Sequence, residues 1–188
     1  MKKVDSQVEF IHNGEEIKAT LSTYYDKGIE RHSTIMFNYK DINVHISLDE
    51  DEKYYFVAPL HCRVLDKLGL DGYKKYEKYL SDIRTIEHNY IVVNDKVYNY
   101  YSKLISSSPK YYVVRLKMAD GNYLDGTYRF MTVQDHGNKR MLFKNLQYQA
   151  QNYFKENKIE PAIECLNQEK TEEYQKKKKW INEVHESL

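Results

Sequence analysis

The sequence predicts an α+β fold: antiparallel β-sheet in a meander and hairpins, a helical insertion after the first strands, and a C-terminal helical segment. Three observations support this prediction. Stretches of alternating apolar and polar residues, typical of half-buried strands, fill two separate regions of the chain. Short turn signals such as Asn13-Gly14 join these stretches. Helical periodicity appears between the two regions and after the second.

The length of 188 residues, with 41% hydrophobic and 30% charged residues, fits one globular domain over residues 1–188. We expect four sections: a β-meander at 1–58, a helical insertion at 59–89, β-hairpins at 90–135 and C-terminal helices at 136–188. No apolar run approaches the roughly 20 residues that span a bilayer, and no signal peptide is evident. The cysteines Cys62 and Cys165 make no disulfide framework, which favours buried thiols and a cytoplasmic location.

The first section predicts an antiparallel meander. Its first hairpin turns at Asn13-Gly14, because both residues tolerate positive φ, and its second turns at Lys40-Asp41. An acidic turn at 49–52 precedes the last strand. The expected strands are 7–12, 16–21, 34–39, 42–48 and 53–57.

The helical insertion predicts a short helix closed by Gly69 and a second helix capped by Asp71. One face of the second helix carries Tyr73, Tyr76, Leu80, Ile83 and Glu87.

The second β region predicts two hairpins, which turn at Asn94-Asp95 and at Asp120-Gly121. Residues 106–109, Ser-Ser-Ser-Pro, are the best candidate for a flexible loop. The expected strands are 90–93, 96–100, 111–118 and 128–133.

The last section predicts a helix at 142–154 and a second helix from Pro161, in its first turn, towards Val184, with a break near Asn167. The apolar stripe expected on the first of these helices consists of Leu142, Leu146, Gln149 and Tyr153.

The chain contains 19 tyrosines against six phenylalanines and one tryptophan. Tyrosine is an apolar ring with a polar tip, so it is stable at a core rim or a contact surface. Lysine outnumbers arginine 23 to 6, and there are 13 asparagines but five alanines. This bias matches AT-rich codons and indicates a low-GC bacterium or its phage or mobile element, and it accounts for part of the tyrosine excess.

Charge is unevenly distributed along the chain. Residues 1–95 carry 13 basic and 17 acidic groups, whereas residues 96–144 carry nine basic and three acidic groups, a net charge of +6. Basic side chains and tyrosines interleave there, as they do where phosphates and bases are bound. The alternative is a solvated strand face beside a tyrosine-rich core. The candidate binding residues are Tyr98, Tyr100, Tyr101, Lys110, Tyr112, Arg115, Lys117, Tyr123, Tyr128, Arg129, Lys139 and Arg140.

A run of four lysines at 176–179 precedes Trp180 near the C-terminus. On a helix these lysines point in all directions, and we expect Glu172–Lys176 and Glu173–Lys177 pairs. Two interpretations stay open: a solvated helix that docks by its tip, or a partner-binding helix with Trp180 as a hot spot.

Motifs for metal, cofactor or nucleotide chemistry are missing. The seven histidines and two cysteines show no ligand spacing, and the acidic run at 49–52 lacks the pattern of a calcium loop. Phosphate-binding loops and a serine-hydrolase elbow are also missing. We therefore expect no metal, no cofactor and no enzymatic activity.

One segment does resemble a catalytic family. Residues 111–126, with an Asp120-Gly121 turn and Tyr123-Leu124-Asp125-Gly126 after it, are similar to the opening hairpin of GIY-YIG nucleases. The resemblance implies two tyrosines beside a reactive phosphate, and Arg140 is the candidate for the family's helical arginine. The first strand lacks the Gly-Ile-Tyr order, and the second motif has one residue more than Tyr-Ile-Gly.

These observations favour a non-enzymatic interaction protein, because tyrosine is enriched at interfaces. The specific hypothesis is an inhibitor of a host nucleic-acid-processing defence enzyme, of anti-CRISPR type, that docks through the basic, tyrosine-rich region. A nucleic-acid-binding module is the alternative, and a divergent GIY-YIG-like nuclease is a further one. We expect a protein partner, with nucleic acid possible, no membrane association and the oligomeric state left open.

Overall fold

The computed structural model describes the backbone of residues 2–48, 57–107, 110–130 and 136–188, and the side chains of residues 2–48, 59–103, 113–126 and 142–188. The chain divides into two compact units: unit 1 is Met1–Lys75 with Val184–Leu188, and unit 2 is Tyr76–Glu183. Both units contain antiparallel strands and helix, so the predicted α+β class is confirmed. The single domain over residues 1–188 stays a prediction.

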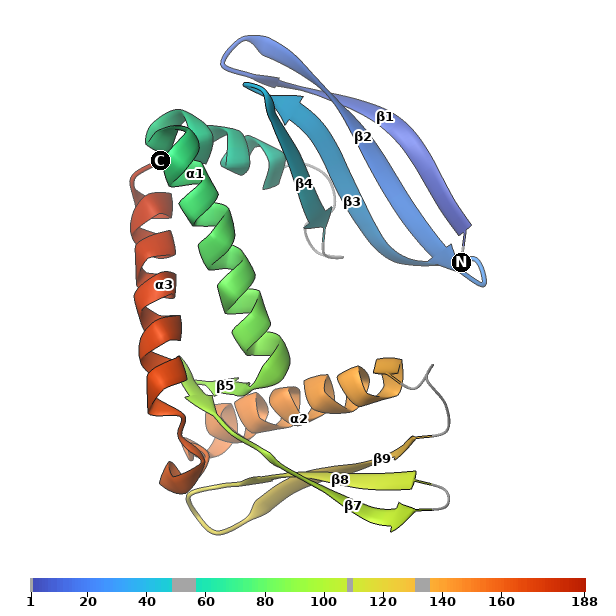
Figure 1. Ribbon diagram of the computed structural model, residues 1–188, viewed down its shortest axis with the longest axis vertical. Coiled ribbons are helices and arrows are strands. Elements are labelled where there is room, and N and C mark those ends of the chain that lie inside the picture. The colour runs from blue at the N-terminus through green and yellow to red at the C-terminus, as the bar shows by residue number, and fades with distance from the viewer. Residues whose placement is uncertain (1, 49–56, 108–109, 131–135) are drawn as a thin grey trace. The chain divides into compact units, whose positions relative to one another are not determined.

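Unit 1 contains an antiparallel sheet whose described strands follow in chain order (Figure 1). The strands are β1 (Lys2–His12), β2 (Glu15–Asp26), β3 (Ile29–Tyr39) and β4 (Ile42–Leu48). The predicted turns are confirmed: φ is 51° and 78° at Asn13 and Gly14, and 49° and 62° at Lys40 and Asp41. Positive φ at both turn residues matches the right-handed twist of the flanking strands.

Two features of this meander differ from the prediction. Strands β1 to β3 extend well beyond the predicted segments, and a third turn at Lys27-Gly28 joins β2 to β3. The ends of these strands show no alternation of apolar and polar residues, so the sequence pattern does not predict them. They are strands because they pair with their neighbours in the sheet. The predicted acidic turn and last strand fall on residues 49–56, outside the described residues, and Val57 begins a helix instead.

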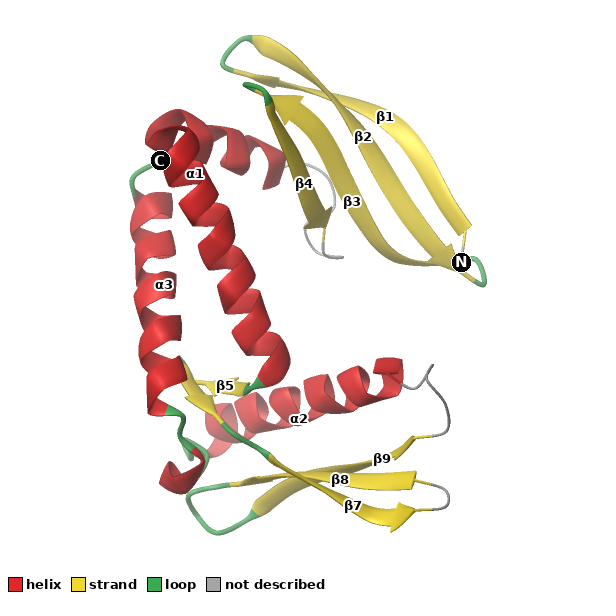
Figure 2. Cartoon of the chain, viewed as in Figure 1, coloured by secondary structure: helices red, strands yellow, loops and turns green. Residues whose placement is uncertain are grey.

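Helix α1 (Val57–Asn89) bends at Gly69, where φ is 68° and ψ is −178° (Figure 2). A positive φ is accessible to glycine at little cost, so this residue ends the first helical piece and the predicted break is confirmed. The first piece belongs to unit 1, and Tyr73, after the bend, is fully buried in that unit. Tyr76 begins unit 2 and is also buried.

Unit 2 contains a short hairpin and a larger antiparallel sheet among its described residues. The hairpin turns at Asn94 and Asp95, both at positive φ, as predicted. The larger sheet differs from the prediction in two ways: it contains a strand over Tyr101–Ser107 that was not expected, and its returning strand begins at Tyr123. The strands are β5 (Ile91–Val93), β6 (Lys96–Tyr98), β7 (Tyr101–Ser107), β8 (Lys110–Lys117) and β9 (Tyr123–Phe130).

Helix α2 (His136–Asn157) lies along one face of the β7–β9 sheet (Figure 1). The predicted helix is confirmed, but its buried stripe is rotated, since Gln149 is exposed whereas Phe143 and Ala150 are buried. Helix and sheet approach closely at Gly126, where an added Cβ would lie 2.5 Å from Leu142 Cδ1. The shared core contains Val114, Leu116, Met118, Phe143, Leu146 and Ala150.

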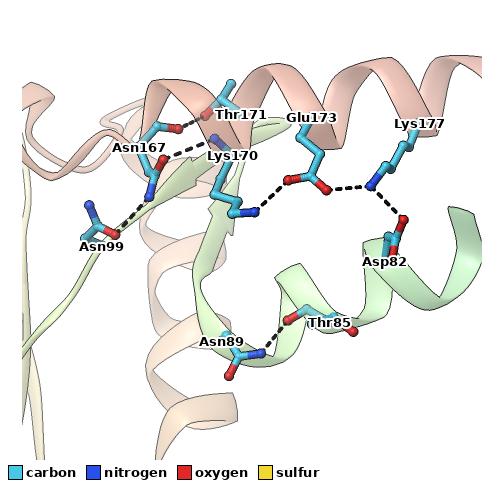
Figure 3. Close-up of polar contacts among 9 residues, drawn as sticks. All are labelled: Asp82, Thr85, Asn89, Asn99, Asn167, Lys170, Thr171, Glu173 and Lys177. Carbon is cyan, nitrogen blue, oxygen red and sulfur yellow. Dashed lines mark hydrogen bonds and ion pairs between the residues drawn. The ribbon is translucent and has the colours of Figure 1, made fainter.

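Pro161 does not begin a helix. It forms an isolated β-bridge with Met118, and a short 3-10 helix, η3 (Ile163–Cys165), follows. Helix α3 (Gln168–Glu186) starts after Asn167, whose Oδ1 accepts a hydrogen bond from the Lys170 backbone N–H at 3.1 Å (Figure 3). The predicted helix therefore begins at Gln168 instead of Pro161, and Asn167 caps it.

An ion-pair chain joins the second half of α1 to α3 inside unit 2 (Figure 3). The mostly buried Lys177 ammonium lies 2.5 Å from Glu173 and 2.7 Å from Asp82, and Glu173 also pairs with Lys170 at 2.7 Å. The predicted Glu173–Lys177 pair is thus confirmed. Trp180 packs edge-on against Tyr79 with ring centroids 5.1 Å apart, which agrees with a helix that docks by its tip.

Candidate binding surface

The β7–β9 sheet presents its second face away from the core that it shares with α2. On β8, Val114 and Leu116 are buried in that core, so Arg115 and Lys117 lie on the opposite face. The register adds the cross-strand neighbours of these residues. We call the resulting surface the open face; its described members are Tyr101, Lys103, Val113, Arg115, Lys117, Tyr123 and Asp125.

Arg115 holds the centre of the open face. The register places Tyr101 and Asp125 directly opposite it on the two neighbouring strands. Its guanidinium donates a hydrogen bond to Asp125 Oδ2 at 2.8 Å and lies 5.1 Å from the Tyr123 ring centroid. Tyr101 and Tyr123 are 58% and 53% exposed. Arg115 therefore lies between the Asp125 carboxylate and the Tyr123 ring, and the rings of Tyr101 and Tyr123 are both open to solvent.

Lys117 joins the open face to the short helix η3. Its ammonium bonds the Glu164 carboxylate, and its backbone carbonyl accepts a hydrogen bond from Ala162 N–H at 2.9 Å. The hydrogen bond and the charge of Glu164 raise the pKa of Lys117, and the same pair lowers the pKa of Glu164. Ile163 beside this pair is 76% exposed, which adds an apolar side chain to the rim of the open face.

Tyr98 belongs to the core, and its predicted place on a binding face is corrected. It is 2% exposed, and its hydroxyl donates a hydrogen bond to Glu160 Oε2 at 3.1 Å. Burial and the Glu160 charge raise the pKa of this phenol. Burial favours protonation of Glu160, but hydrogen bonds from Lys96, Asn94 and Tyr98 outweigh it, so the Glu160 pKa is lowered.

The other predicted residues divide into two groups. Tyr100 is half-buried against Phe143, with ring centroids 5.1 Å apart, and burial raises its pKa. The structure gives the backbone positions of the remaining six and leaves their side chains outside its described part. Lys110 and Tyr112 are on β8, Tyr128 and Arg129 on β9, and Lys139 and Arg140 on α2.

Carboxylates from beyond the basic segment neutralise part of its charge. Glu160 pairs with Lys96 at 2.7 Å and Glu164 with Lys117, while Asp125 pairs with Arg115. Of the five basic residues at 96–144 with described side chains, these three are bonded to a carboxylate. Glu160 and Glu164 lie outside residues 96–144, so the net charge of +6 counted along that segment overstates its positive field. Sequence reasoning missed Glu160, Ile163 and Glu164, because tertiary pairing alone brings them there.

A separate pocket of about 650 Å³ lies between α1, β5, α2 and α3 within unit 2. Three of its charged groups have partners: Glu87 accepts a hydrogen bond from Tyr174 at 2.9 Å, and Lys178 lies 2.5 Å from Asp95. Gln147 bonds both the N–H and the carbonyl of Val92, at 2.8 and 2.7 Å. Its side-chain amide thus caps the outer edge of β5 as a neighbouring strand would.

Unit 1 gathers catalytic residue types around one carboxylate. Asp66 accepts hydrogen bonds from Asn13 Nδ2 at 2.8 Å, from the Tyr39 hydroxyl at 3.0 Å and from Lys40, and His12 Nε2 lies 2.8 Å away. Burial opposes ionisation of Asp66, but these donors dominate and lower its pKa to about 2. We call this group the Asp66 cluster. It ties α1 to two turns of the sheet.

Cys62, one helical turn before Asp66, is 1% exposed, and burial with the nearby Asp66 charge raises the pKa of its thiol to about 12. A thiol of this kind stays protonated at neutral pH and is a poor nucleophile. Within the described residues, no group of three or more His, Cys, Asp or Glu side chains could hold a metal ion.

No protein-family model, no curated protein and no solved structure matches the chain. The segment that resembles the GIY-YIG hairpin does form strand, turn and strand, as β8, Asp120-Gly121 and β9. In it, Gly126 faces Leu142 of α2, so this glycine permits close packing of helix on sheet. None of the helices in the described ranges is both long enough and apolar enough to cross a bilayer.

Proposed function

We propose that the chain is a non-enzymatic interaction protein that binds a partner protein through the open face. The observation that carries this proposal is the exposed Tyr101–Arg115–Tyr123 group. Its arginine is oriented before binding by Asp125 at 2.8 Å and by the Tyr123 ring, whose centroid lies 5.1 Å from the guanidinium, so part of the side-chain entropy cost is already met. Tyrosine and arginine are the residue types enriched at interface hot spots, and rigid aromatic groups cost little to immobilise.

The distribution of charge favours protein over nucleic acid as the partner. Phosphate binding depends on cations that displace counterions, yet Arg115 and Lys117 are engaged by carboxylates. The described open face carries Lys103, Arg115 and Lys117 against Asp125, and Glu164 lies at its rim. A mixed-charge, aromatic surface with exposed Ile163 beside it matches the composition of a protein interface.

The specific form of the proposal is an inhibitor, of anti-CRISPR type, that acts in the cytoplasm of a low-GC bacterium. Its target is a host defence enzyme that processes nucleic acid, and it docks where nucleic acid normally binds. Support comes from the coding bias of the chain and from the exposed rings of Tyr101 and Tyr123, which can stack in a groove that normally holds bases.

Capture from a nuclease-treated low-GC bacterial lysate tests the partner class. We expect the chain to capture one protein, and the complex should persist after nuclease treatment. The captured protein, once purified, should also bind the purified chain directly. Tyr123→Ala removes an exposed ring of the open face and should abolish capture. Tyr148→Ala is the matched control, because Tyr148 is 65% exposed on α2 and outside the open face. Equal capture by both variants contradicts the proposal.

A gel-shift titration against DNA and RNA at low and high salt tests the nucleic-acid alternative. A shift that weakens steeply with salt, together with capture of nucleic acid alone, would replace the proposal with a nucleic-acid-binding module. Metal-dependent cleavage that is lost in Tyr112→Phe and Arg129→Ala would instead establish the nuclease alternative.

A further inference from the structure

Strand β1 ends the strand order of the β1–β4 sheet, and among the described residues it pairs with β2 alone. His12 and Glu15 flank a two-residue turn and form the closing hydrogen-bonded pair. Even-numbered residues of β1 therefore bond β2, and the backbone groups of odd-numbered residues point away from it. The outward row at the edge of the sheet runs through Lys3, Asp5, Gln7, Glu9 and Ile11.

We propose that β1 pairs antiparallel with β1 of a second copy of this chain, about a twofold axis at Ser6. This surface is in unit 1, and the inference is independent of the proposed function. Ser6 then faces Ser6 of the second copy, Val4 faces Val8, and Lys3 faces Glu9. Each residue of the last two pairs occurs on both chains, so the symmetry doubles every favourable contact.

Charge complementarity favours this register over its two neighbours. Antiparallel pairing must place odd residues of β1 opposite odd residues, so the allowed registers differ in steps of two residues. The next register in one direction sets Asp5 against Glu9 twice, and the next in the other direction sets Asp5 against itself. The Ser6-centred register instead sets Lys3 against Glu9 twice and Asp5 against the neutral Gln7. Like charges directly opposite are destabilising and unlike charges stabilising.

Apolar burial points to the same pairing. Val4 and Val8 lie on the sheet face that carries buried Ile17 and Ala19, since Val8 pairs with Ala19 across β2. Val4 is 42% exposed at the edge of this face. Packing Val4 against Val8 of the second copy extends the apolar face across the twofold axis and removes this exposed side chain from water.

Charges on an edge strand often serve to prevent such pairing. In the single chain, Lys3 pairs with Asp5 at 3.0 Å and Glu9 with Lys18 at 3.7 Å. Their side chains are between 43% and 74% exposed, so these local pairs are weak and can be exchanged. Charges prevent edge-to-edge pairing of two β1 strands only if like charges face each other in every register. In the Ser6-centred register no like charges face each other.

Charge reversal with rescue tests the pairing. We expect sedimentation velocity on the full-length chain to show a concentration-dependent dimer. Lys3→Glu sets glutamates against each other twice and should leave monomer alone, and Glu9→Lys should do the same. The Lys3→Glu/Glu9→Lys double variant restores opposite charges and should restore the dimer. A monomeric wild-type chain at high concentration overturns the proposal, and so does a dimer insensitive to both reversals. Circular dichroism checks that each variant is folded.

Disulfide trapping tests the register. In the proposed pairing, Ser6 forms a non-hydrogen-bonded pair with itself at a Cα separation of about 4.5 Å, within disulfide reach. Ser6→Cys, made in a Cys165→Ser background, should therefore yield a covalent dimer on mild oxidation. Gln7→Cys is the matched control, because Gln7 faces Asp5 of the second copy in this register. The two introduced cysteines would be offset by two residues, with their Cα atoms beyond the roughly 7 Å that a disulfide can bridge. Crosslinking of Gln7→Cys in preference to Ser6→Cys overturns the register, and crosslinking of neither overturns the interface.

Discussion

The Asp66 cluster of unit 1 and the open face of unit 2 place the same residue types in different environments. Both combine tyrosine, a cation and an aspartate. In the Asp66 cluster, Tyr39 is 4% exposed and every donor converges on one carboxylate. On the open face, Tyr123 is 53% exposed, and Arg115 bonds Asp125 at the surface. Residue type alone therefore does not separate a buried structural contact from an exposed surface; burial does.

The largest expected effect is loss of the Asp66 cluster. Asp66→Ala leaves the donors from two turns without their acceptor, and we expect the free energy of unfolding to fall by about 3 kcal/mol. Asp26→Ala is the matched control, since Asp26 has an exposed pair with Arg31 at 3.3 Å. Urea denaturation followed by circular dichroism measures both variants. An equal loss in the free energy of unfolding for both variants would show that burial does not make Asp66 more important for stability than Asp26.

The pH dependence of stability sharpens the same contrast. The Asp66 pKa is lowered from 3.8 to about 2, so its contribution is complete above pH about 4 and is lost as the pH falls towards 2. The contribution at stake is about 2 kcal/mol. Denaturation midpoints at several pH values should fall more steeply for the wild type than for Asp66→Asn. Parallel curves for the two proteins would contradict this assignment.

A smaller effect is expected at the covered face of the β7–β9 sheet. Gly126→Ala places a Cβ against Leu142, which must move, and we expect a loss of about 1–2 kcal/mol in the free energy of unfolding. The clash is with the end of a flexible side chain, so Leu142→Ala should relieve it. A double-mutant cycle measures this coupling, and additive losses would contradict the close approach of helix and sheet.

The smallest effect belongs to the open face itself. Arg115 and Asp125 are 45% and 47% exposed, so Arg115→Ala should change the free energy of unfolding by less than about 0.5 kcal/mol. Thermal or urea denaturation checks this value. A loss comparable with that of Asp66→Ala would mean that Arg115 is fixed for stability rather than for contact.

Local signals in the sequence predicted much of the fold. Asn13-Gly14 specifies its turn because both residues tolerate positive φ, and Gly69 breaks α1 for the same reason. The prediction of a helix start at Pro161 was wrong, because proline lacks an N–H and is tolerated both in the first turn of a helix and in a β-bridge. Lys27-Gly28 was missed because no hydrophobic alternation flanks it.

The candidate site was less predictable. The alternation of polar and apolar residues along β8 places Arg115 and Lys117 on the face opposite Val114 and Leu116, as the structure does. It had no means of locating Glu160 and Glu164, which reach Lys96 and Lys117 from more than 40 residues away. Nor could it show that Tyr98 is buried while Tyr101 is exposed. Exposure and charge pairing depend on tertiary structure, and those two properties define the open face.

The dissociation constant between the purified full-length chain and the protein that it captures tests the central claim most directly. We expect Tyr123→Ala to weaken binding about 30-fold, equivalent to about 2 kcal/mol at an interface hot spot, while Tyr148→Ala leaves the constant unchanged. Isothermal titration calorimetry on both variants measures the difference. Equal affinity of Tyr123→Ala and the wild type would contradict the assignment of the open face as the binding surface.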